Sequence, residues 1–441
     1  MASIAQKALF RWEQVEILGD LERLELVLRT LDDEALVQAL EEHRGKGRDR
    51  YPIRAIWNSL LAGIVFQHPS IESLRRELRR NGQLRQICGF DLCKGVAAVP
   101  SASAYSRFLR VLQKKRFQAV LEGVFERMVQ RWYEGVSEFG EHLGIDGKAI
   151  GSYAVRRGKK EGDRRGEQDA DWGRHEQHIQ TEGGEVVQKV KRWFGFTVHI
   201  IAETSYELPV AFRVTKASCN EQPEGRALID EFFSREKERG KRAKYFCADR
   251  GYDSTETVTR LWDKYDVKPV IAIRNQWKDG EGTKTVPGTE NAEYDYKGNV
   301  RCVCPVSGVS HEMAYRGFEK DRRTLKYACP AAHYGYACAG AKKCPLAQKA
   351  IRIPLQVDRR IFTPLARSSY AWKRQYRKRT ALERINSRLD RCYGFEMHTH
   401  RGLRKVHTMI SLAFLVMHAM ALGRLKQQEH DKLRSLVAQV A

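Results

Sequence analysis

The chain has 441 residues, of which 42% are hydrophobic, so it can bury a sizeable core, and its length suggests two or three domains. Lys and Arg outnumber Asp and Glu by 78 to 55, and the net charge of +23 disfavours a basic partner and favours a polyanion, with nucleic acid as the first candidate. The first 16 residues carry charges and lack a continuous apolar segment, so they do not resemble a secretory signal, and we expect a cytoplasmic protein. Ten cysteines in such a chain are expected to be reduced thiols or metal ligands instead of a disulfide framework.

Residues 1–135 are predicted to be helical. Apolar residues recur at helical spacing over 21–31 and again over 56–64. A basic amphipathic helix is predicted over 70–80, and residues 100–103 have the composition of a helix start. Two helices joined by a turn can place one of them in a DNA groove, so this region is predicted to bind DNA or to dimerise. An all-helical packing module is an equally good interpretation.

A different pattern begins at residue 136 and continues to residue 274. The predicted strands cover residues 143–146, 193–202, 209–215, 243–248 and 268–273, with helices over 224–238 and 254–265. Three strands are thus followed by a helix, a strand, a helix and a strand. This order, with a carboxylate at the end of the first and fourth strands, predicts an α/β fold with an RNase H-like mixed sheet.

Two stretches interrupt this pattern. Residues 156–191 are rich in Gly and charged residues and poor in apolar ones, which predicts a long solvated loop. Residues 275–350 contain turn glycines and short hairpin-like runs, which predicts an insertion before the last part of the core at 351–441.

The last part of the chain is basic and also holds the most apolar run. Residues 351–410 contain 15 Lys or Arg against four Asp or Glu, a balance of 15 − 4 = +11, and are our first choice for a phosphate-facing surface. Residues 409–422 are apolar but are interrupted by His418. Because this run is shorter than the roughly 20 residues that span a bilayer, we expect a buried helix.

Three carboxylates stand out from this background. Asp146 and Asp249 each end a predicted strand, and Glu383 lies in an arginine-dense helix. Any one of them has the ordinary interpretation of a solvated surface charge. Together they can hold two Mg²⁺ ions, which activate an attacking oxygen and stabilise a leaving oxygen in phosphodiester chemistry. Asp253 is the main rival to Asp249, although it fits a helix cap better.

Three segments resemble the acidic motifs of bacterial insertion-sequence transposases of the DDE type. They are GIDGK at 144–148, ADRGYDS at 248–254 and YRKRTALE at 376–383. Residues 10–115 are similar to the helical N-terminal region of those enzymes, and residues 193–220 resemble the strand pair after their first acidic motif. The resemblance implies an RNase H-like fold, binding of double-stranded DNA at the element's terminal repeats, cleavage there with two Mg²⁺ ions or with Mn²⁺ in their place, and strand transfer. Pairing of two DNA ends implies a homodimer.

By this resemblance Asp146, Asp249 and Glu383 are the metal ligands and catalytic residues. Tyr376 and Arg379 are then expected to hold a DNA-end phosphate, for which the planar guanidinium group is suited. Their offsets of 3 and 7 to Glu383 place all three on one face of a continuous helix.

The rest of the third motif follows the family less closely. Arg384 and Arg388 are expected to contact the DNA backbone, with simple solvation as the equal alternative. The family has a basic residue seven positions after the glutamate, where this chain has Asp390. This departure leaves the fourth role of the motif unassigned.

Five cysteines gather in the predicted insertion: Cys302, Cys304, Cys329, Cys338 and Cys344. Four thiolates can bind a structural Zn²⁺ ion. However, only one residue separates the first two cysteines, and five candidates compete for four places. Reduced, partly buried thiols are the alternative.

The sequence thus predicts a DDE transposase. A metal-dependent nuclease without strand transfer would use the same acids, because water and a DNA 3′-hydroxyl can attack at the same metal ions. A non-catalytic DNA-binding or zinc-ribbon regulator would need only the positive charge and the cysteines.

Overall fold

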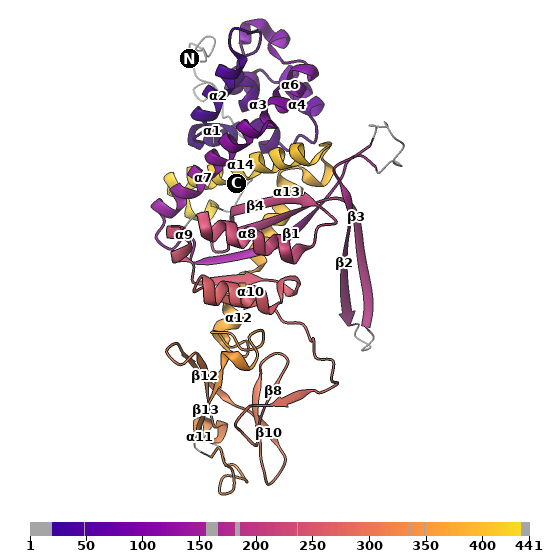
Figure 1. Cartoon of the computed structure of the whole chain (residues 1–441). Coiled ribbons are helices and arrows are strands. Elements are labelled where there is room, and N and C mark those ends of the chain that lie inside the picture. Colours follow the sequence, from indigo (N-terminus) through magenta and orange to yellow (C-terminus); the bar gives the residue numbers. More distant parts are fainter. Residues whose placement is uncertain are drawn as a thin grey trace.

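The structure, a computed structural model, describes residues 20–47, 49–155, 166–180, 186–235, 237–335, 337–347 and 349–433. Figure 1 shows the N-terminal helices at the top, a central sheet with its helices, and a smaller β-rich part at the bottom. A long two-stranded arm leaves the central sheet on one side.

The N-terminal region is helical, as expected. Its helices are α1 (Leu21–Thr30), α2 (Glu34–Arg44), α3 (Ile53–Val65), α4 (Ile71–Arg80), α5 (Gly82–Cys88), η2 (Leu92–Ala98), α6 (Ala102–Leu112) and α7 (Lys115–Gly135). Two of the starts follow from hydroxyl caps, since Ser70 Oγ accepts from the Ser73 N–H at 3.1 Å and Ser101 Oγ from the Ala104 N–H at 3.2 Å.

The central sheet has the expected RNase H-like topology. Its strands are β1 (His142–Gly151), β2 (Asp171–Gln180), β3 (Val186–Glu203), β4 (Leu208–Lys216), β5 (Tyr245–Ala248) and β6 (Lys268–Ile271). β3 pairs antiparallel with both β1 and β4, whereas β5 runs parallel to β1 and β6 parallel to β5. Apart from the arm strand β2, the order across the sheet is therefore β4-β3-β1-β5-β6.

Helices and single turns complete this core. They are α8 (Glu221–Arg235), α9 (Lys237–Arg242), η3 (Arg250–Tyr252), α10 (Thr255–Thr259), η4 (Arg260–Lys264), α12 (Tyr370–Arg377), α13 (Thr380–Cys392), η6 (Phe395–Met397), α14 (Leu403–Lys426) and η7 (His430–Lys432). α8 packs on β3 and β4, α12 on β5 and β6, and α13 on β1.

The apolar run at 409–422 is a buried helix, as predicted. α14 is long and apolar enough to cross a membrane, but 94% of its most apolar window is buried inside the protein. It contacts α1, α3 and α7 on one side and β4 on another, and Figure 1 shows it between the N-terminal helices and the sheet. His418 is accommodated because its Nε2 lies 2.7 Å from the Pro209 carbonyl oxygen.

The stretch at 156–191 was wrongly predicted to be a loop. Residues 156–165 and 181–185 lie outside the described residues, but β2 pairs antiparallel with the first half of β3, from Asp171 opposite Gly195 onwards. Figure 1 shows this β2–β3 arm projecting from the sheet. Where the side chains of the arm are described, neighbouring residues that point to opposite faces are both exposed, as at Arg174, His175 and Glu176. Such a ribbon needs no apolar face, so its sequence lacks the alternation by which a half-buried strand is recognised.

The insertion contains two small antiparallel sheets. One is built from β7 (Thr283–Thr285), β8 (Ala292–Asp295), β9 (Val300–Val303) and β10 (Ser310–Glu312), and the other from β11 (Ala314–Glu319), β12 (Thr324–Ala328) and β13 (Ala350–Pro354). The short helix α11 (Pro330–Tyr334) and the turn η5 (Leu355–Val357) complete it. These strands enclose a second apolar core that extends to Phe362 and Ala366 and includes Trp262 from the central part.

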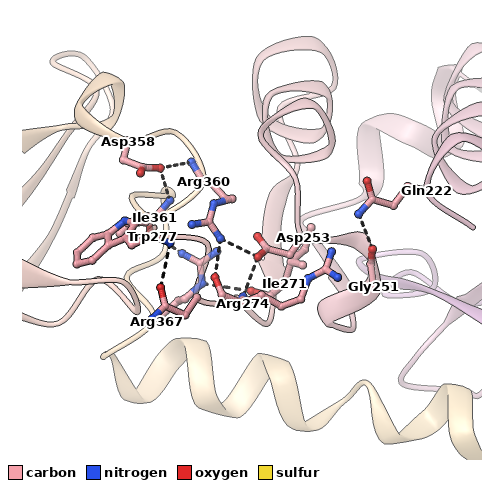
Figure 2. Close-up of polar contacts among 11 residues, drawn as sticks. Gln222, Gly251, Asp253, Ile271, Arg274, Trp277, Asp358, Arg360, Ile361 and Arg367 are labelled. Carbon is pink, nitrogen blue, oxygen red and sulfur yellow. Dashed lines mark hydrogen bonds and ion pairs between the residues drawn. The ribbon is translucent and has the colours of Figure 1, made fainter. Parts of the chain in front are cut away.

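A buried ion pair joins the insertion to the central sheet (Figure 2). Arg360 Nη1 donates to Asp253 Oδ2 and to the Arg274 carbonyl oxygen, each at 2.8 Å. The Arg274 N–H donates to the same Asp253 oxygen at 2.8 Å. Arg367 bonds the carbonyl oxygens of Ile271 and Ile361. Asp253 is therefore part of this joint, and the helix cap predicted for it is provided by Ser254, whose Oγ accepts from the Thr257 N–H at 3.2 Å.

Candidate active site

Two of the three predicted acids lie on neighbouring strands. β1 and β5 run parallel with Ile145 opposite Ala248, so the next residues, Asp146 and Asp249, follow at the same level. Asp249 comes directly after β5, as expected. Asp146 instead lies within β1, because pairing with the antiparallel β3 carries this strand on to Gly151. The prediction that Asp146 ends its strand is therefore wrong.

The third acid comes from α13, which packs on β1. One turn after Glu383, Asn386 donates through Nδ2 to Asp146 Oδ2 at 2.9 Å. Asp146, Asp249, Glu383 and Asn386 line the same groove, whose volume is about 1330 Å³. The fold thus brings three acids, each more than 100 positions from the next in sequence, to one place. We call this groove the acidic groove.

Tyr376 and Glu383 do not share one continuous helix. Tyr376 lies in α12 and Glu383 in α13. Between the two helices the backbone forms 3₁₀-type hydrogen bonds to the residue three positions earlier. The Arg379 N–H donates to the Tyr376 carbonyl oxygen at 3.0 Å, and the Leu382 N–H donates to the Arg379 carbonyl oxygen at 2.9 Å. Arg379 nevertheless joins the two. Its guanidinium group lies 5.6 Å from the centre of the Tyr376 ring, and its Nη2 donates to Glu383 Oε1 at 2.6 Å.

A fourth carboxylate, which the sequence analysis missed, also faces the groove. Glu221 is the first residue of α8, and the Tyr252 hydroxyl donates to its Oε1 at 3.3 Å. A Cβ atom built on Gly147 would lie 2.1 Å from the same oxygen. The glycine that follows Asp146 in the first acidic motif was the available signal, because a strand position without a side chain indicates a close neighbour.

The electrostatics show how closely these acids are grouped. Burial and then the charge of Asp249 raise the pKa of Asp146 to about 6. Burial and then the charges of Asp249 and Asp146 raise the pKa of Glu221 to about 7. Arg379 lowers the pKa of Asp146, but as a smaller effect. Negative charge in the groove is therefore incompletely neutralised by the side chains around it.

The donor chemistry of the groove fits Mg²⁺, which takes hard oxygen ligands. Asp146, Glu221, Asp249 and Glu383 are among the seven Asp and Glu residues that line it, and Asn386 Oδ1 is buried with no hydrogen-bond partner. As the side chains of the described residues stand, no three His, Cys, Asp or Glu groups are arranged to hold a metal ion. The fit therefore rests on donor type and charge.

Comparison with known protein families identifies the chain. The family model described as "Transposase DDE domain" matches residues 171–418, more than half of the chain, and "Transposase domain (DUF772)" matches residues 13–110. The chain belongs to the DDE transposase family. It is therefore an enzyme, a DNA transposase, as the three motifs predicted. The DDE match includes Asp249 and Glu383 and begins after Asp146.

A solved synaptic complex of the piggyBac transposase with hairpin DNA is similar at 12% identity, over 97% of this transposase and 87% of that chain, with a TM-score of 0.29. None of the curated proteins matches.

At Asp390, where the resemblance predicted a basic residue, the structure places a cation next to the carboxylate. Lys148, two positions after Asp146 on β1, has its Nζ 2.5 Å from Asp390 Oδ2. Both residues line the acidic groove. A positive charge is thus present near the position where a basic residue was expected, but it comes from strand β1 and not from α13.

The two arginines expected to contact DNA differ in their surroundings. Arg388 is buried and its Nη2 pairs with Glu207, which is also buried. Arg384 Nε donates to the other oxygen of Glu207 at 2.6 Å, and half of its side chain (52%) is exposed. From these positions Arg388 stabilises the packing of α13 on the β3–β4 turn, and Arg384 is the one open to a ligand.

The five cysteines of the insertion converge. All five line one pocket of about 650 Å³, and all are free thiols. The Ser307 N–H donates to Cys304 Sγ at 3.5 Å, and Asn291 Nδ2 donates to Cys344 Sγ at 3.3 Å. Hydrogen bonds from Ser307 and Val306 lower the pKa of Cys304 to about 7. Donors of this kind favour the thiolate form, which is the form that binds metals.

Proposed function

We propose that this transposase binds the terminal inverted repeats of an insertion sequence, cleaves the DNA there in a Mg²⁺-dependent reaction and joins the free 3′ ends to target DNA. The observation that carries the proposal is the acidic groove, where Asp146, Asp249 and Glu383 meet beside Arg379. Two Mg²⁺ ions, or Mn²⁺ in their place, would supply an activated attacking oxygen and a stabilised leaving oxygen.

The side chains of the groove have distinct parts in this proposal. Asp146 and Asp249 on the rigid sheet and Glu383 on α13 would be the metal ligands, and Asn386 orients Asp146 through its hydrogen bond. Arg379 is bound to Glu383 in this structure, and it would turn to a DNA phosphate once a metal ion neutralises that carboxylate.

The proposed DNA contacts lie around the groove. Tyr376 would pack beside the end phosphate next to Arg379, and Arg384 would contact the backbone. Arg388 would act indirectly, by holding Glu207 and α13 in place. The β2–β3 arm also lines the groove, and its Arg174 and Lys191 carry positive charges that would attract the phosphates of DNA.

Replacement of Asp146 with Asn tests the proposed chemistry. Purified wild type, Asp146→Asn and, as a matched control, the exposed Asp321→Asn would be incubated with Mg²⁺, DNA carrying the element ends and a target plasmid. We expect cleavage and joined products with wild type and the control, and at least a thousandfold loss of both with Asp146→Asn, whose DNA binding should persist. Cleavage without joined products would favour a plain nuclease, and unchanged cleavage by Asp146→Asn would refute the metal site.

The partners follow from the same proposal. Cleavage of both ends of one element requires two active sites, so a homodimer paired on two DNA ends is proposed, with the N-terminal helices as the DNA-binding or dimerising region. The protein would act in the cytoplasm of a bacterial cell, at the nucleoid.

We also propose that the cysteine pocket binds a structural Zn²⁺ ion. Support comes from the convergence of five thiols from separate segments and from the N–H donors at Cys304 and Cys344. Four thiolates complete the tetrahedral shell of a structural zinc ion, and the fifth cysteine would remain a neighbour. Such an ion would leave the chemistry of the acidic groove unchanged.

A further inference from the structure

Glu221 is a carboxylate of the acidic groove that belongs to none of the three acidic motifs. It begins α8, which follows β4, and lines the acidic groove together with Asp146 and Asp249. Asp146, Asp249 and Glu383 come from β1, the end of β5 and α13, so α8 is a further element that brings a carboxylate to these acids.

Two glycines make room for this carboxylate, one in each of the first two acidic motifs. A Cβ atom on Gly147 would lie 2.1 Å from Glu221 Oε1, and a Cβ atom on Gly251 would lie 3.3 Å from Glu221 Oε2 and 2.8 Å from Asp249 Oδ1. Neither glycine has a positive φ angle, so the backbone conformation does not require glycine at these positions. The space beside Asp146 and Asp249 is instead what the missing side chains provide.

The surroundings of Glu221 hold it toward the groove. Tyr252 is fully buried, and its hydroxyl group donates a hydrogen bond to Glu221 Oε1. The next residue, Gln222, donates through Nε2 to the Gly251 carbonyl oxygen at 2.7 Å (Figure 2), which ties the start of α8 to the turn after Asp249. Among the described residues, no Lys, Arg or His lies within ion-pair distance of Glu221.

Glu224, one turn along the same helix, shows the ordinary behaviour of an acid in a first helical turn. It forms an ion pair with Arg213 at 3.1 Å and lies outside the acidic groove. An acid in this turn is favourable for the helix dipole wherever it points. The helix dipole therefore explains why an acid is found at the start of α8. It does not explain why Glu221 lies beside Asp146 and Asp249 and not beside a cation.

We propose that Glu221 is a fourth carboxylate of the catalytic site and a direct ligand of the metal ion held by Asp146 and Asp249. The inference rests on the proposed function. It goes beyond the three acids of the DDE motif, and it means that α8 is part of the metal site and not only a support for the sheet.

Binding of Mn²⁺ to the full-length, metal-free protein tests this inference by isothermal titration calorimetry, without reference to activity. Wild type, Glu221→Gln and the matched Glu224→Gln would be compared, with Asp146→Asn as the reference for a lost ligand. We expect Glu221→Gln to weaken Mn²⁺ binding at least tenfold and Glu224→Gln to remain within twofold of wild type.

Thermal unfolding separates a ligand from a structural residue. In the metal-free protein, a carboxylate that serves as a metal ligand is repelled by the neighbouring Asp146 and Asp249. Glu221→Gln should therefore raise the melting temperature of the metal-free protein. It should also reduce the rise in melting temperature that Mn²⁺ produces. Gly147→Ala gives a second route to the same result, because it retains the carboxylate but places a methyl group in its path, and it should also weaken Mn²⁺ binding.

The outcomes distinguish this inference from the proposed function. Unchanged Mn²⁺ binding in Glu221→Gln together with a loss in Asp146→Asn would overturn the role of Glu221 alone. Unchanged binding in both variants would overturn the metal site as a whole. A fall in the metal-free melting temperature of Glu221→Gln with unchanged Mn²⁺ affinity would assign it a structural role and also overturn the inference.

Discussion

At the scale of single residues, the carboxylates of this transposase are distinguished by their surroundings. Asp146 and Glu221 have raised pKa values because burial and neighbouring acids disfavour their charged forms. Asp253 forms a buried ion pair with Arg360. Glu383 forms an ion pair with Arg379, and about half of its side chain is exposed. Residue type and position along the chain suggested only that Asp146, Asp249 and Glu383 belong together. Which further acid joins them depends on the approach of α8, which has no local signature.

Glu203, at the end of β3, gives a pH dependence outside the acidic groove. It is fully buried, and burial raises its pKa from 4.5 to about 7 despite a hydrogen bond from the Tyr206 N–H. Between these two values the unfolded chain loses a proton that the folded protein retains, so stability falls as the pH rises and is level again above about 7. We expect the free energy of unfolding of Glu203→Gln, relative to wild type, to increase by roughly 2 to 3 kcal/mol between pH 5 and pH 8.

Urea unfolding at the two pH values measures this difference. The exposed Glu290→Gln is the control and should show no such change. An equal response of the two variants would contradict a raised pKa at Glu203.

At the scale of elements, the sequence patterns did not predict correctly where a helix or a strand is continuous. The acidic motif YRKRTALE resembles one helix, yet the chain tightens between α12 and α13, because Tyr376 packs with Trp372 against the β5–β6 edge while α13 packs on β1. The β2–β3 arm was missed for the opposite reason. Its pairing is regular, but its described residues 174–176 and 190–192 are exposed, so they carry no apolar alternation.

The joint between the insertion and the sheet supplies a prediction at this scale. Replacement of Asp253 with Asn leaves Arg360 buried without its counter-charge, and a broken buried pair costs about 3 to 5 kcal/mol. Asp263→Asn is a matched control, because Asp263 in the Asp263–Arg359 pair at 2.7 Å is exposed, and ion pairs with an exposed partner contribute about 1 kcal/mol or less.

Chemical denaturation of the full chain distinguishes the two variants. We expect Asp253→Asn to be destabilised by several kcal/mol more than Asp263→Asn. Similar, small losses would show that Arg360 finds enough compensation in its bond to the Arg274 carbonyl oxygen.

At the scale of the whole molecule, two apolar cores are held together by side chains at their boundary. The central core extends from the N-terminal helices through α14 to the sheet, and the insertion has its own smaller core. Between α11 and β13 the described residues form neither helix nor strand. A small part of this kind commonly gains stability from a bound metal ion.

Zinc content tests the proposed role of the cysteine pocket. We expect about one Zn²⁺ per chain in protein purified without chelator, and a large loss of zinc in Cys329→Ser and Cys338→Ser, measured by mass spectrometry of the metal. Cys93→Ser is the control, because Cys93 is an exposed thiol far from the pocket in sequence and outside its lining. Zinc-free wild type, or full zinc in both pocket variants, would contradict the proposal.

The helices, most strands and three of the groove's acids could be inferred from local patterns, because periodicity, caps and acidic motifs are properties of short segments. The depth of Asp146 within β1, the contribution of α8 to the groove and the cation at Asp390 could not, since each depends on contacts between residues far apart in the chain. Lys148 and Asp390 are 242 positions apart and 2.5 Å from one another. Local sequence thus predicts which elements form and which chemical groups they carry. The set of side chains that share the groove is decided by tertiary packing, because packing brings together residues that are far apart in the sequence.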